Sequence, residues 1–378
     1  MADQYVETTT KGLGSRLMDS IKGVVIGLIL FIASFVLLYW NEGREGLAPL
    51  ANTASEITAD SLNTDTSLNG KLVSVTGKLT TAEKLGDELY LLPGDYFALN
   101  RKVEMFAWVE DQKTESNTNL GGSETSTTTY DYSKDWENSP EDSNNFKYPA
   151  GHANLVKSLE DKKNTVTTAQ VGVYNIAPKD LDLPSFTDLT LSKEIVTLAN
   201  NAVLAGSSYI YLPLAGAQGS FENPAVGDLR ISYTVLLPDD EVTVFGKLEQ
   251  EQIKKFTSSE GQSLYRMLEG DRAAAIALIA QEDTTILWVL RIVGFLMMWF
   301  GLGSLLAPLT TLGDIVPIIG TLGRSVVSVI TFIISLVLSI VTIIVSRILH
   351  NPLALVITVV VIVGGVVLIL TRKKAQAK

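Results

Sequence analysis

The chain opens and closes with long apolar runs that enclose a polar middle. Residues 23–40, 326–345 and 352–370 contain no charged side chain, and residues 286–306 contain one, Arg291. Each run has about the length, roughly 20 residues, that an α-helix needs to cross the hydrocarbon core of a bilayer. The pattern predicts a membrane protein with four transmembrane α-helices.

The first apolar run has a competing interpretation as a secretory signal peptide, because basic residues precede it. A signal peptide has a shorter apolar core and a cleavage site of small residues. This run instead ends in Tyr39 and Trp40, whose rings favour the membrane interface. We interpret it as a retained anchor, preceded by a short disordered tail at residues 1–22.

The polar middle of the chain, residues 41–283, has the pattern of a β-rich domain. Val103, Met105, Ala107 and Val109 share one face at 103–110, and apolar residues alternate with polar ones at 229–235. This period of two predicts half-buried strands. Residues 73–79 (VSVTGKL) and 242–248 (VTVFGKL) echo each other and predict two more strands. The glycine inside each of these marks a bulge or a close backbone approach. We predict one large α+β domain, rich in strands, between the first and second helices.

Other segments of the middle domain are less regular. The polar tract at residues 113–147 predicts a long loop or hairpin that folds back in part through its aromatic residues. Short helices are predicted at residues 155–162, 180–183 and 192–201. The alanine-rich segment 271–282 is the strongest helix candidate. It leads directly to the run at 286–306, so we expect one continuous helix entering the bilayer.

Basic residues indicate the orientation of the helices. Lys11, Arg16 and Lys22 precede the first run, and a basic tail at residues 371–378 follows the last. Four spans place both termini on one side, and the positive-inside rule makes that side cytoplasmic. The β-rich domain is then extracytoplasmic or lumenal. The link at residues 307–325 is predicted to be a cytoplasmic loop or an interfacial helix.

Charge and composition narrow the possible functions. Residues 41–283 contain 20 Lys and Arg against 37 Asp and Glu, a net charge of −17 within a chain of −11. Nucleic acid as a partner is disfavoured, because its binding needs a positive surface. The chain contains no cysteine, which excludes disulfides, thiol nucleophiles and cysteine-ligated metals.

Several motifs, in one order, resemble the LUMA family, also described as the transmembrane protein 43 family. They are NEGR at 41–44, VEMFAWVE at 103–110, YDYSKDW at 130–136, NF and GH within 145–152, NPAVGDLRIS at 223–232 and WVLR at 288–291. The resemblance covers most of the chain and implies a four-pass protein that self-associates.

The resemblance also implies locations and partners. Eukaryotic members lie in the endoplasmic reticulum and inner nuclear membrane, where they are linked to lamins and emerin as organisers and not as enzymes. The missing cysteines and the Val- and Ile-rich last hairpin depart from the family pattern. A prokaryotic member would lie in the bacterial inner membrane, with the lipid bilayer, further copies of itself and other membrane proteins as partners.

A charged residue inside an apolar run is the first candidate for a functional site. A charge in hydrocarbon is costly, so Arg291 either snorkels to the headgroups or forms an ion pair. Glu42 lies just beyond the first run on the same side and is the candidate partner, with Arg44 beside it in the NEGR motif. We predict that these three residues couple the membrane helices to the β-rich domain or to a neighbouring subunit.

Glycines in the first two runs are candidates for close helix packing. Gly23 and Gly27 are four residues apart in the first run, and Gly294 and Gly301 lie in the second. Small residues at such spacings let helix backbones approach closely. The competing explanation is that glycine is generally frequent in membrane helices.

No catalytic, cofactor or metal site is predicted. His152 and His350 are the two histidines of the chain, and a metal site usually needs several ligands at fixed spacing. The acidic residues within 131–142 lack the turn glycine of a Ca²⁺ loop, so they are better explained as solvated loop charges. No nucleotide-binding or nucleophile motif is present.

The sequence thus predicts a membrane scaffold that self-associates, organises membrane protein complexes through its outer domain, and is not an enzyme. The alternative is a transporter or channel, whose pathway would need intramembrane acids or rows of polar residues. A membrane hydrolase is a further alternative, which would need an activated nucleophile in the outer domain.

Overall fold

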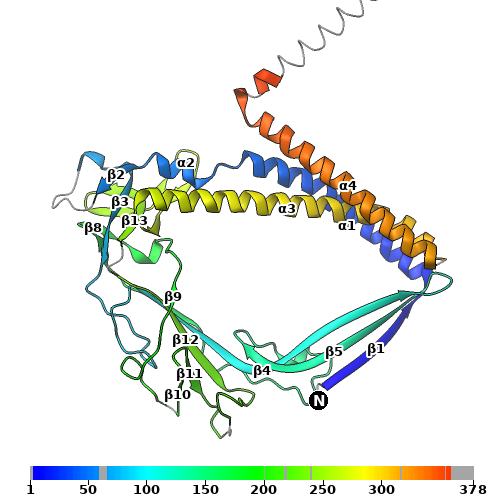
Figure 1. The fold of residues 1–378 in the computed structure, drawn as a ribbon, viewed down its shortest axis with the longest axis horizontal. Coiled ribbons are helices and arrows are strands. Elements are labelled where there is room, and N and C mark those ends of the chain that lie inside the picture. Colours follow the sequence, from blue (N-terminus) through cyan, green and yellow to red (C-terminus); the bar gives the residue numbers. More distant parts are fainter. Residues whose placement is uncertain are drawn as a thin grey trace, which may run out of the picture. The chain divides into compact units, whose positions relative to one another are not determined.

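The chain forms two compact units in the computed structural model, and each is described separately. The structure describes residues 3–58, 66–199, 201–216, 219–238, 241–315, 317–353 and 355–358. The β-rich unit comprises Met1–Val6, Leu47–Lys113 and Thr128–Ala280, and the helical unit comprises Glu7–Gly46, Thr114–Thr127 and Gln281–Lys378 (Figure 1). The strands β1, β4 and β5 and the helix α3 continue from one unit into the other.

The first sheet has eight strands in the order β1-β5-β4-β12-β11-β10, with β6 also pairing β4 and β9 pairing β12. Its strands are β1 (Asp3–Lys11), β4 (Ala98–Thr118), β5 (Glu124–Glu137), β6 (Lys162–Thr165), β9 (Thr187–Asp188), β10 (Val203–Ala205), β11 (Tyr209–Leu212) and β12 (Leu229–Leu236). The alternating segments 103–110 and 229–235 are confirmed as strands within β4 and β12. They pair antiparallel with Leu229 opposite Met105 and Ile231 opposite Val103, and all four side chains are buried.

The second sheet has seven strands in the order β17-β13-β14-β8-β7-β3-β2, and β13 also pairs β3, which closes a ring of five strands. Its strands are β2 (Ser55–Thr58), β3 (Leu72–Thr80), β7 (Ala169–Val171), β8 (Tyr174–Ile176), β13 (Glu241–Glu249), β14 (Gln252–Lys254) and β17 (Arg266–Glu269). The pair β15 (Phe256–Thr257) and β16 (Ser263–Leu264) is separate.

The two echoing segments of the sequence are confirmed as strands, and they pair with each other. Val75 of β3 lies opposite Val244 of β13, and Val73 lies opposite Gly246. A Cβ at Gly246 would stand 2.6 Å from the carbonyl oxygen of Lys254 and 2.6 Å from a methyl of Ile253. The glycine is therefore required by the close approach of β14, as glycine inside a strand often is.

A buried ion pair holds the loop before β4 against the first sheet. Arg101 Nη1 donates to Asp87 Oδ1 at 2.6 Å, and Tyr233 donates its hydroxyl hydrogen to the other carboxylate oxygen. Arg101 also donates to the carbonyl oxygen of Glu160. All three side chains of the Asp87–Arg101–Tyr233 network are less than 9% exposed. Because each charge is paired and hydrogen-bonded, the network can lie inside the domain.

The β-rich unit also contains the start of α3 (Arg272–Gly313) and the short helix α2 (Leu47–Asn52). Asp271 caps α3, accepting a hydrogen bond from the backbone N–H of Ala274 at 2.8 Å, as N-cap aspartates do. Ala275 and Ile279 are buried in one cluster with Phe245 of β13. The predicted helix over 271–282 is thus confirmed, and it continues without a break into the apolar run at 286–306.

The helical unit contains α1 (Leu13–Gly43), the rest of α3, and α4 (Pro317–Leu349). The structure contains three candidate membrane spans among its described residues, at Leu13–Asn52, Arg272–Gly313 and Gly323–Leu349. The chain is accordingly a membrane protein with a large β-rich domain. Residues 352–353 and 355–358 are helical. The rest of the predicted fourth span, 352–370, and the basic tail, 371–378, lie outside the described residues.

Some expectations from the sequence are wrong. Residues 3–11 form a strand and the helix begins at Leu13, in place of a disordered tail. No helix forms at 155–162 or at 192–199. Residues 180–183 begin at the last residue of a 3₁₀ turn, η3 (Pro178–Asp180). Two other 3₁₀ turns are η1 (Thr66–Leu68) and η2 (Ser143–Asn145). The segment ending at 161 is extended because it hydrogen-bonds β4: Asp161 accepts from the N–H of Val103 at 2.8 Å.

The polar tract and the last link also differ from a simple loop. Most of the tract at 113–147 is confirmed as a hairpin of β4 and β5, whose buried Tyr130, Tyr132 and Phe146 pack together. Most of the link at 307–325 is helical, because α3 extends to Gly313 and α4 begins at Pro317.

Candidate functional site

The sequence-predicted partners Glu42 and Arg291 form an ion cluster near the end of α1, and Arg347 of α4 joins it. Arg291 Nε donates to Glu42 Oε1 at 2.6 Å, and Arg291 Nη2 donates to Oε2 at 2.8 Å. Arg347 Nε donates to Oε2 at 2.9 Å. Glu42 is 1% exposed, Arg291 is 10% exposed and Arg347 is 61% exposed. One buried carboxylate therefore ties α1, α3 and α4 together.

Neighbouring groups fix the orientation of this Glu42 cluster. The guanidinium of Arg291 lies over the ring of Trp288, 4.8 Å from its centroid, in a cation–π arrangement. Asn41 Nδ2 donates to the carbonyl oxygen of Leu287 at 3.0 Å, which adds a second bond between α1 and α3. The bidentate contact and the ring both restrict the guanidinium plane, so arginine suits this position better than lysine.

The remaining residues of the NEGR motif have local packing roles. A Cβ at Gly43 would collide with the imidazole of His350, whose ring lies 4.4 Å from that of Tyr39. Arg44 does not join the Glu42 cluster; its Nη2 reaches the carbonyl oxygen of Asp283 at 3.5 Å. The motif is thus the point at which α1 ends against α3 and α4.

Three of the four predicted packing glycines lie at contacts between helices. A Cβ at Gly301 of α3 would stand 2.7 Å from the backbone nitrogen of Phe31 and 2.9 Å from the carbonyl oxygen of Gly27, both in α1. A Cβ at Gly294 would likewise stand 2.6 Å from the side chain of Leu38 in α1. Gly23 has no neighbour within 4 Å of such a Cβ among the described residues, so it is not at a contact.

A second ion cluster, which sequence reasoning missed, lies at the other end of these helices. Asp314, in the turn between α3 and α4, is 1% exposed. It accepts hydrogen bonds from Arg16 Nη2 of α1 at 2.5 Å and from Arg324 Nε of α4 at 3.1 Å. The tip of the β4–β5 hairpin is included, because Arg16 Nη1 donates to the carbonyl oxygen of Gly122 at 2.6 Å.

The signal for this Asp314 cluster was present but weak. Asp314 is the only acidic residue in the semi-apolar link 307–325, and a lone acid beside apolar runs calls for a basic partner. The partner Arg16 lies 298 residues away in sequence, where it is one of several basic residues that precede the first apolar run. No local spacing connects the two.

The histidine of the β-rich unit is structural. His152 is fully buried, and its ring stacks on Tyr132 at a centroid distance of 3.8 Å. Its Nδ1 lies 2.8 Å from the carbonyl oxygen of Tyr148, and its Nε2 lies 3.2 Å from Asp3 Oδ2 in β1. His152 thereby attaches the N-terminal strand to the sheet.

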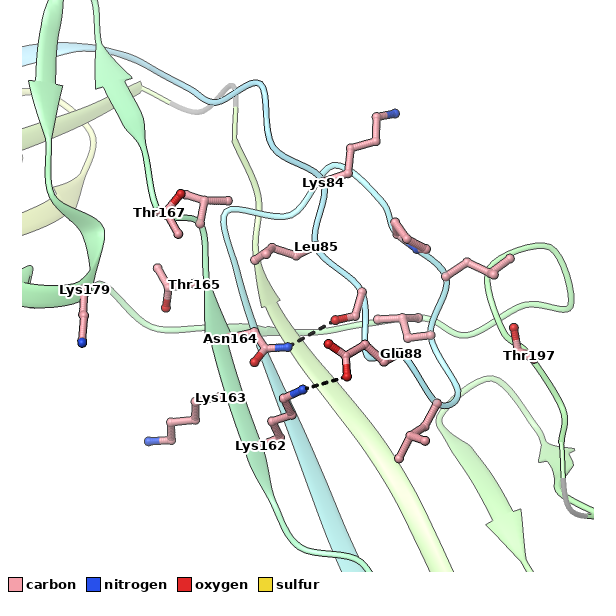
Figure 2. Close-up of a pocket in the computed structure, with 16 residues that line it drawn as sticks. Lys84, Leu85, Glu88, Lys162, Lys163, Asn164, Thr165, Thr167, Lys179 and Thr197 are labelled. Carbon is pink, nitrogen blue, oxygen red and sulfur yellow. Dashed lines mark hydrogen bonds and ion pairs between the residues drawn. The ribbon is translucent and has the colours of Figure 1, made fainter.

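A cavity of the β-rich unit measures about 810 Å³ and lies between β6 and the loop before β4. Four lysines line it, together with Glu88: Lys84, Lys162, Lys163 and Lys179. Figure 2 shows Lys162 directed at Glu88, at a distance of 3.6 Å, while Lys163 and Lys179 extend in other directions. Because the ammonium groups do not converge, the cavity does not have the arrangement of an anion site.

Taken together, the fold and the two ion clusters define a multi-helix membrane protein with an inserted β-rich domain. The chain belongs to the Transmembrane protein 43 family, whose model matches residues 105–352. This confirms the resemblance carried by the sequence motifs.

Named relatives are similar over most of their length. Transmembrane protein 43 of Homo sapiens is 28% identical over 347 residues, which cover 84% of this chain and 85% of the relative. The protein of the same name from Mus musculus is 28% identical, covering 83% and 82%. Transmembrane protein 43 homolog of Drosophila melanogaster is 25% identical over 288 residues, covering 73% and 74%. No solved structure matches the chain.

Proposed function

We propose that the protein is a non-enzymatic membrane scaffold that self-associates and organises membrane protein complexes through its β-rich domain. The observation that carries the proposal is the use of the charges near the apolar runs. Glu42 and Arg291 form a bidentate ion pair, and Asp314 pairs with both Arg16 and Arg324. Such charges lock three helices together, as expected for a fixed anchor of a large domain.

A transporter or channel remains the alternative function. Its pathway would need charged or polar groups that stay available to a moving solute. The charges of the two clusters instead face each other, which favours the scaffold. Ion flux into liposomes that requires Arg291 would favour the alternative.

The particle mass tests self-association. The protein is purified in a nonionic detergent, and light scattering after size exclusion gives its mass without the detergent contribution. The scaffold proposal expects a defined oligomer whose mass is constant on tenfold dilution. A monomer at every concentration would overturn it. Arg291→Leu is expected to weaken the oligomer if the Glu42 cluster supports assembly, and Lys163→Gln in the cavity of the β-rich unit is the matched control.

Sidedness is a separate part of the proposal. Lys11 and Arg16 favour the cytoplasm for the start of α1, and the acidic domain is then outside, with four spans in all. The hairpin tip binds the Arg16 end of the helices, which counts against this orientation, because the tip and the start of α1 must then lie on one side of the bilayer. The hairpin arm at residues 111–117 is polar and exposed, so it is not stable in hydrocarbon, and a cytoplasmic Arg16 with the domain outside would require it to cross.

Because the chain has no cysteine, single cysteines report sidedness directly. Leu120→Cys at the hairpin tip (84% exposed) and Ser259→Cys in the β-rich unit (exposed) are labelled with a membrane-impermeant maleimide in sealed vesicles. Labelling of Ser259→Cys only from the side opposite to the N-terminus supports the domain outside. Labelling of Ser259→Cys from the side of the N-terminus would overturn that orientation and leave the scaffold proposal intact.

A further inference from the structure

The Glu42 cluster has one carboxylate and two guanidiniums, so it has one positive charge in excess. The bidentate contact with Arg291 already engages both oxygens of the carboxylate. Arg347 adds a second guanidinium to the same oxygen, through Nε alone. Within the described part of the chain, the two terminal nitrogens of Arg347 have no partner, and its side chain is 61% exposed. The cluster therefore presents a guanidinium fork to its surroundings.

Aromatic residues place this end of the helices at the level of lipid headgroups. Tyr39 and Trp40 of α1 are 46% and 55% exposed, and Trp288 of α3 is 56% exposed. They come within a turn or two of Glu42 and Arg291 along α1 and α3, and Trp288 contacts the guanidinium of Arg291. Exposed Trp and Tyr in membrane helices concentrate at the interface between hydrocarbon and water. Arg347 follows directly after the apolar run 326–345 of α4.

We propose that Arg347, supported by the Glu42 cluster, binds the phosphate of an anionic phospholipid headgroup. A planar guanidinium binds two phosphate oxygens with two parallel hydrogen bonds. Nε of Arg347 is held by Glu42, which leaves Nη1 and Nη2 directed to other groups. Glu42 has only one charge against two guanidiniums, so an anion at Arg347 restores neutrality, as in basic pockets between membrane helices. This inference is independent of whether the protein is a scaffold.

The test uses the full chain in nonionic detergent and counts bound lipids by native mass spectrometry. Phosphatidylglycerol and phosphatidylcholine with identical acyl chains are added at equal concentrations. Both lipids carry a phosphate, but the choline cation neutralises that of phosphatidylcholine, so the unbalanced charge of Arg347 predicts a preference of roughly tenfold for phosphatidylglycerol. Arg347→Gln should reduce the preference to less than about twofold. Equal binding of the two lipids to the wild type would overturn the proposal.

Arg324→Gln is the matched control. Arg324 lies on the same helix, also faces a buried carboxylate, and has both Nε and Nη2 engaged by Asp314. Its loss should leave the phosphatidylglycerol preference unchanged. A preference that falls equally in both variants would show a general charge effect and overturn the site.

Two further measurements keep the result decisive. Glycerol phosphate at millimolar concentration should not displace the lipid; displacement would show a site for free phosphate and overturn the lipid assignment. If Arg347→Gln does not elute as a folded particle, Arg347→Lys replaces it. Lysine keeps the charge but lacks the fork, so the preference should fall to a value between those of the wild type and no preference. An unchanged preference would overturn the bidentate arrangement.

Discussion

Removing the carboxylate of Glu42 tests whether the helical unit depends on the buried ion pair. In Glu42→Leu, Arg291 keeps its charge and its buried position, 10% exposed, but loses both of its short bonds. Breaking a buried pair by removing one partner typically costs about 3–5 kcal/mol, because the other charge is left uncompensated. We therefore expect Glu42→Leu to lower the unfolding free energy by about that amount.

The double variant Glu42→Leu/Arg291→Leu separates this cost from simple loss of contacts. Replacing both members of a buried pair by apolar residues is often neutral or stabilising, and Arg347 is exposed enough to reach water. The double variant should lie within about 1 kcal/mol of the wild type. Arg347→Gln alone should cost less than about 1 kcal/mol, because exposed pairs are screened. The unfolding free energy should therefore be lowest for Glu42→Leu and close to the wild-type value for the double variant and for Arg347→Gln.

The assay is unfolding of the purified protein in mixed micelles with increasing denaturing detergent. Tryptophan fluorescence reports on all five tryptophans of the chain, including Trp288 beside Arg291, and circular dichroism follows helix content independently. A double variant that is less stable than Glu42→Leu would refute the reasoning, because it would show that the pair contributes attraction beyond its own desolvation cost. Equal losses for Glu42→Leu and Arg347→Gln would refute the assignment of Arg291 as the main partner.

Three other changes have expected outcomes. Gly301→Ala should cost about 1–3 kcal/mol, because its Cβ would meet α1 backbone at 2.7 Å, whereas Gly303→Ala, with open space, should be neutral in the same micelle unfolding assay. Hydrogen bonds, chiefly from the Thr167 side chain, lower the pKa of Glu83 to about 2. The stabilisation by the ionised Glu83 is therefore present above the ordinary pKa of 4.5 and is lost as the pH falls from 4.5 towards 2. The difference in thermal midpoint between the wild type and Glu83→Gln should shrink over that pH range and be constant between pH 6 and 8. Asp87→Ala should cost about 3–5 kcal/mol by leaving its buried arginine unpaired, measured by urea unfolding of the β-rich unit's circular dichroism signal.

Side-chain periodicity predicted the central strands because each has one buried and one exposed face. Leu229 and Ile231 alternate with polar neighbours, and the alternation identifies the buried face. The helix predicted over 155–162 was wrong because local side-chain periodicity does not determine the structure there. The conformation of this segment is set by hydrogen bonds to β4, such as Asp161 to Val103 at 2.8 Å, and no local pattern contains that information.

The Glu42–Arg291 contact could be proposed from the sequence because a charge in lipid must either snorkel or pair, and Glu42 is an acid just beyond the first run on the same side. Arg347 gave no comparable signal. It ends an apolar run, where snorkelling to the headgroups fully explains an arginine. Its contact with the same carboxylate depends on how α4 packs on α1, which neither segment specifies alone.

The two ion clusters also set how deeply the helices can sit in a bilayer. Arg16 and Glu42 are 26 residues apart in one continuous helix, roughly 39 Å at 1.5 Å per residue. The hydrocarbon core is about 30 Å thick, so a crossing α1 has room for one cluster at each headgroup level, with about 9 Å to spare. Arg347 is then held where phosphate groups are, and a shift of α1 along its axis by more than about 9 Å would move Asp314 or Glu42 into hydrocarbon. The same pairs that join the helices thus oppose large movements of α1 through the membrane.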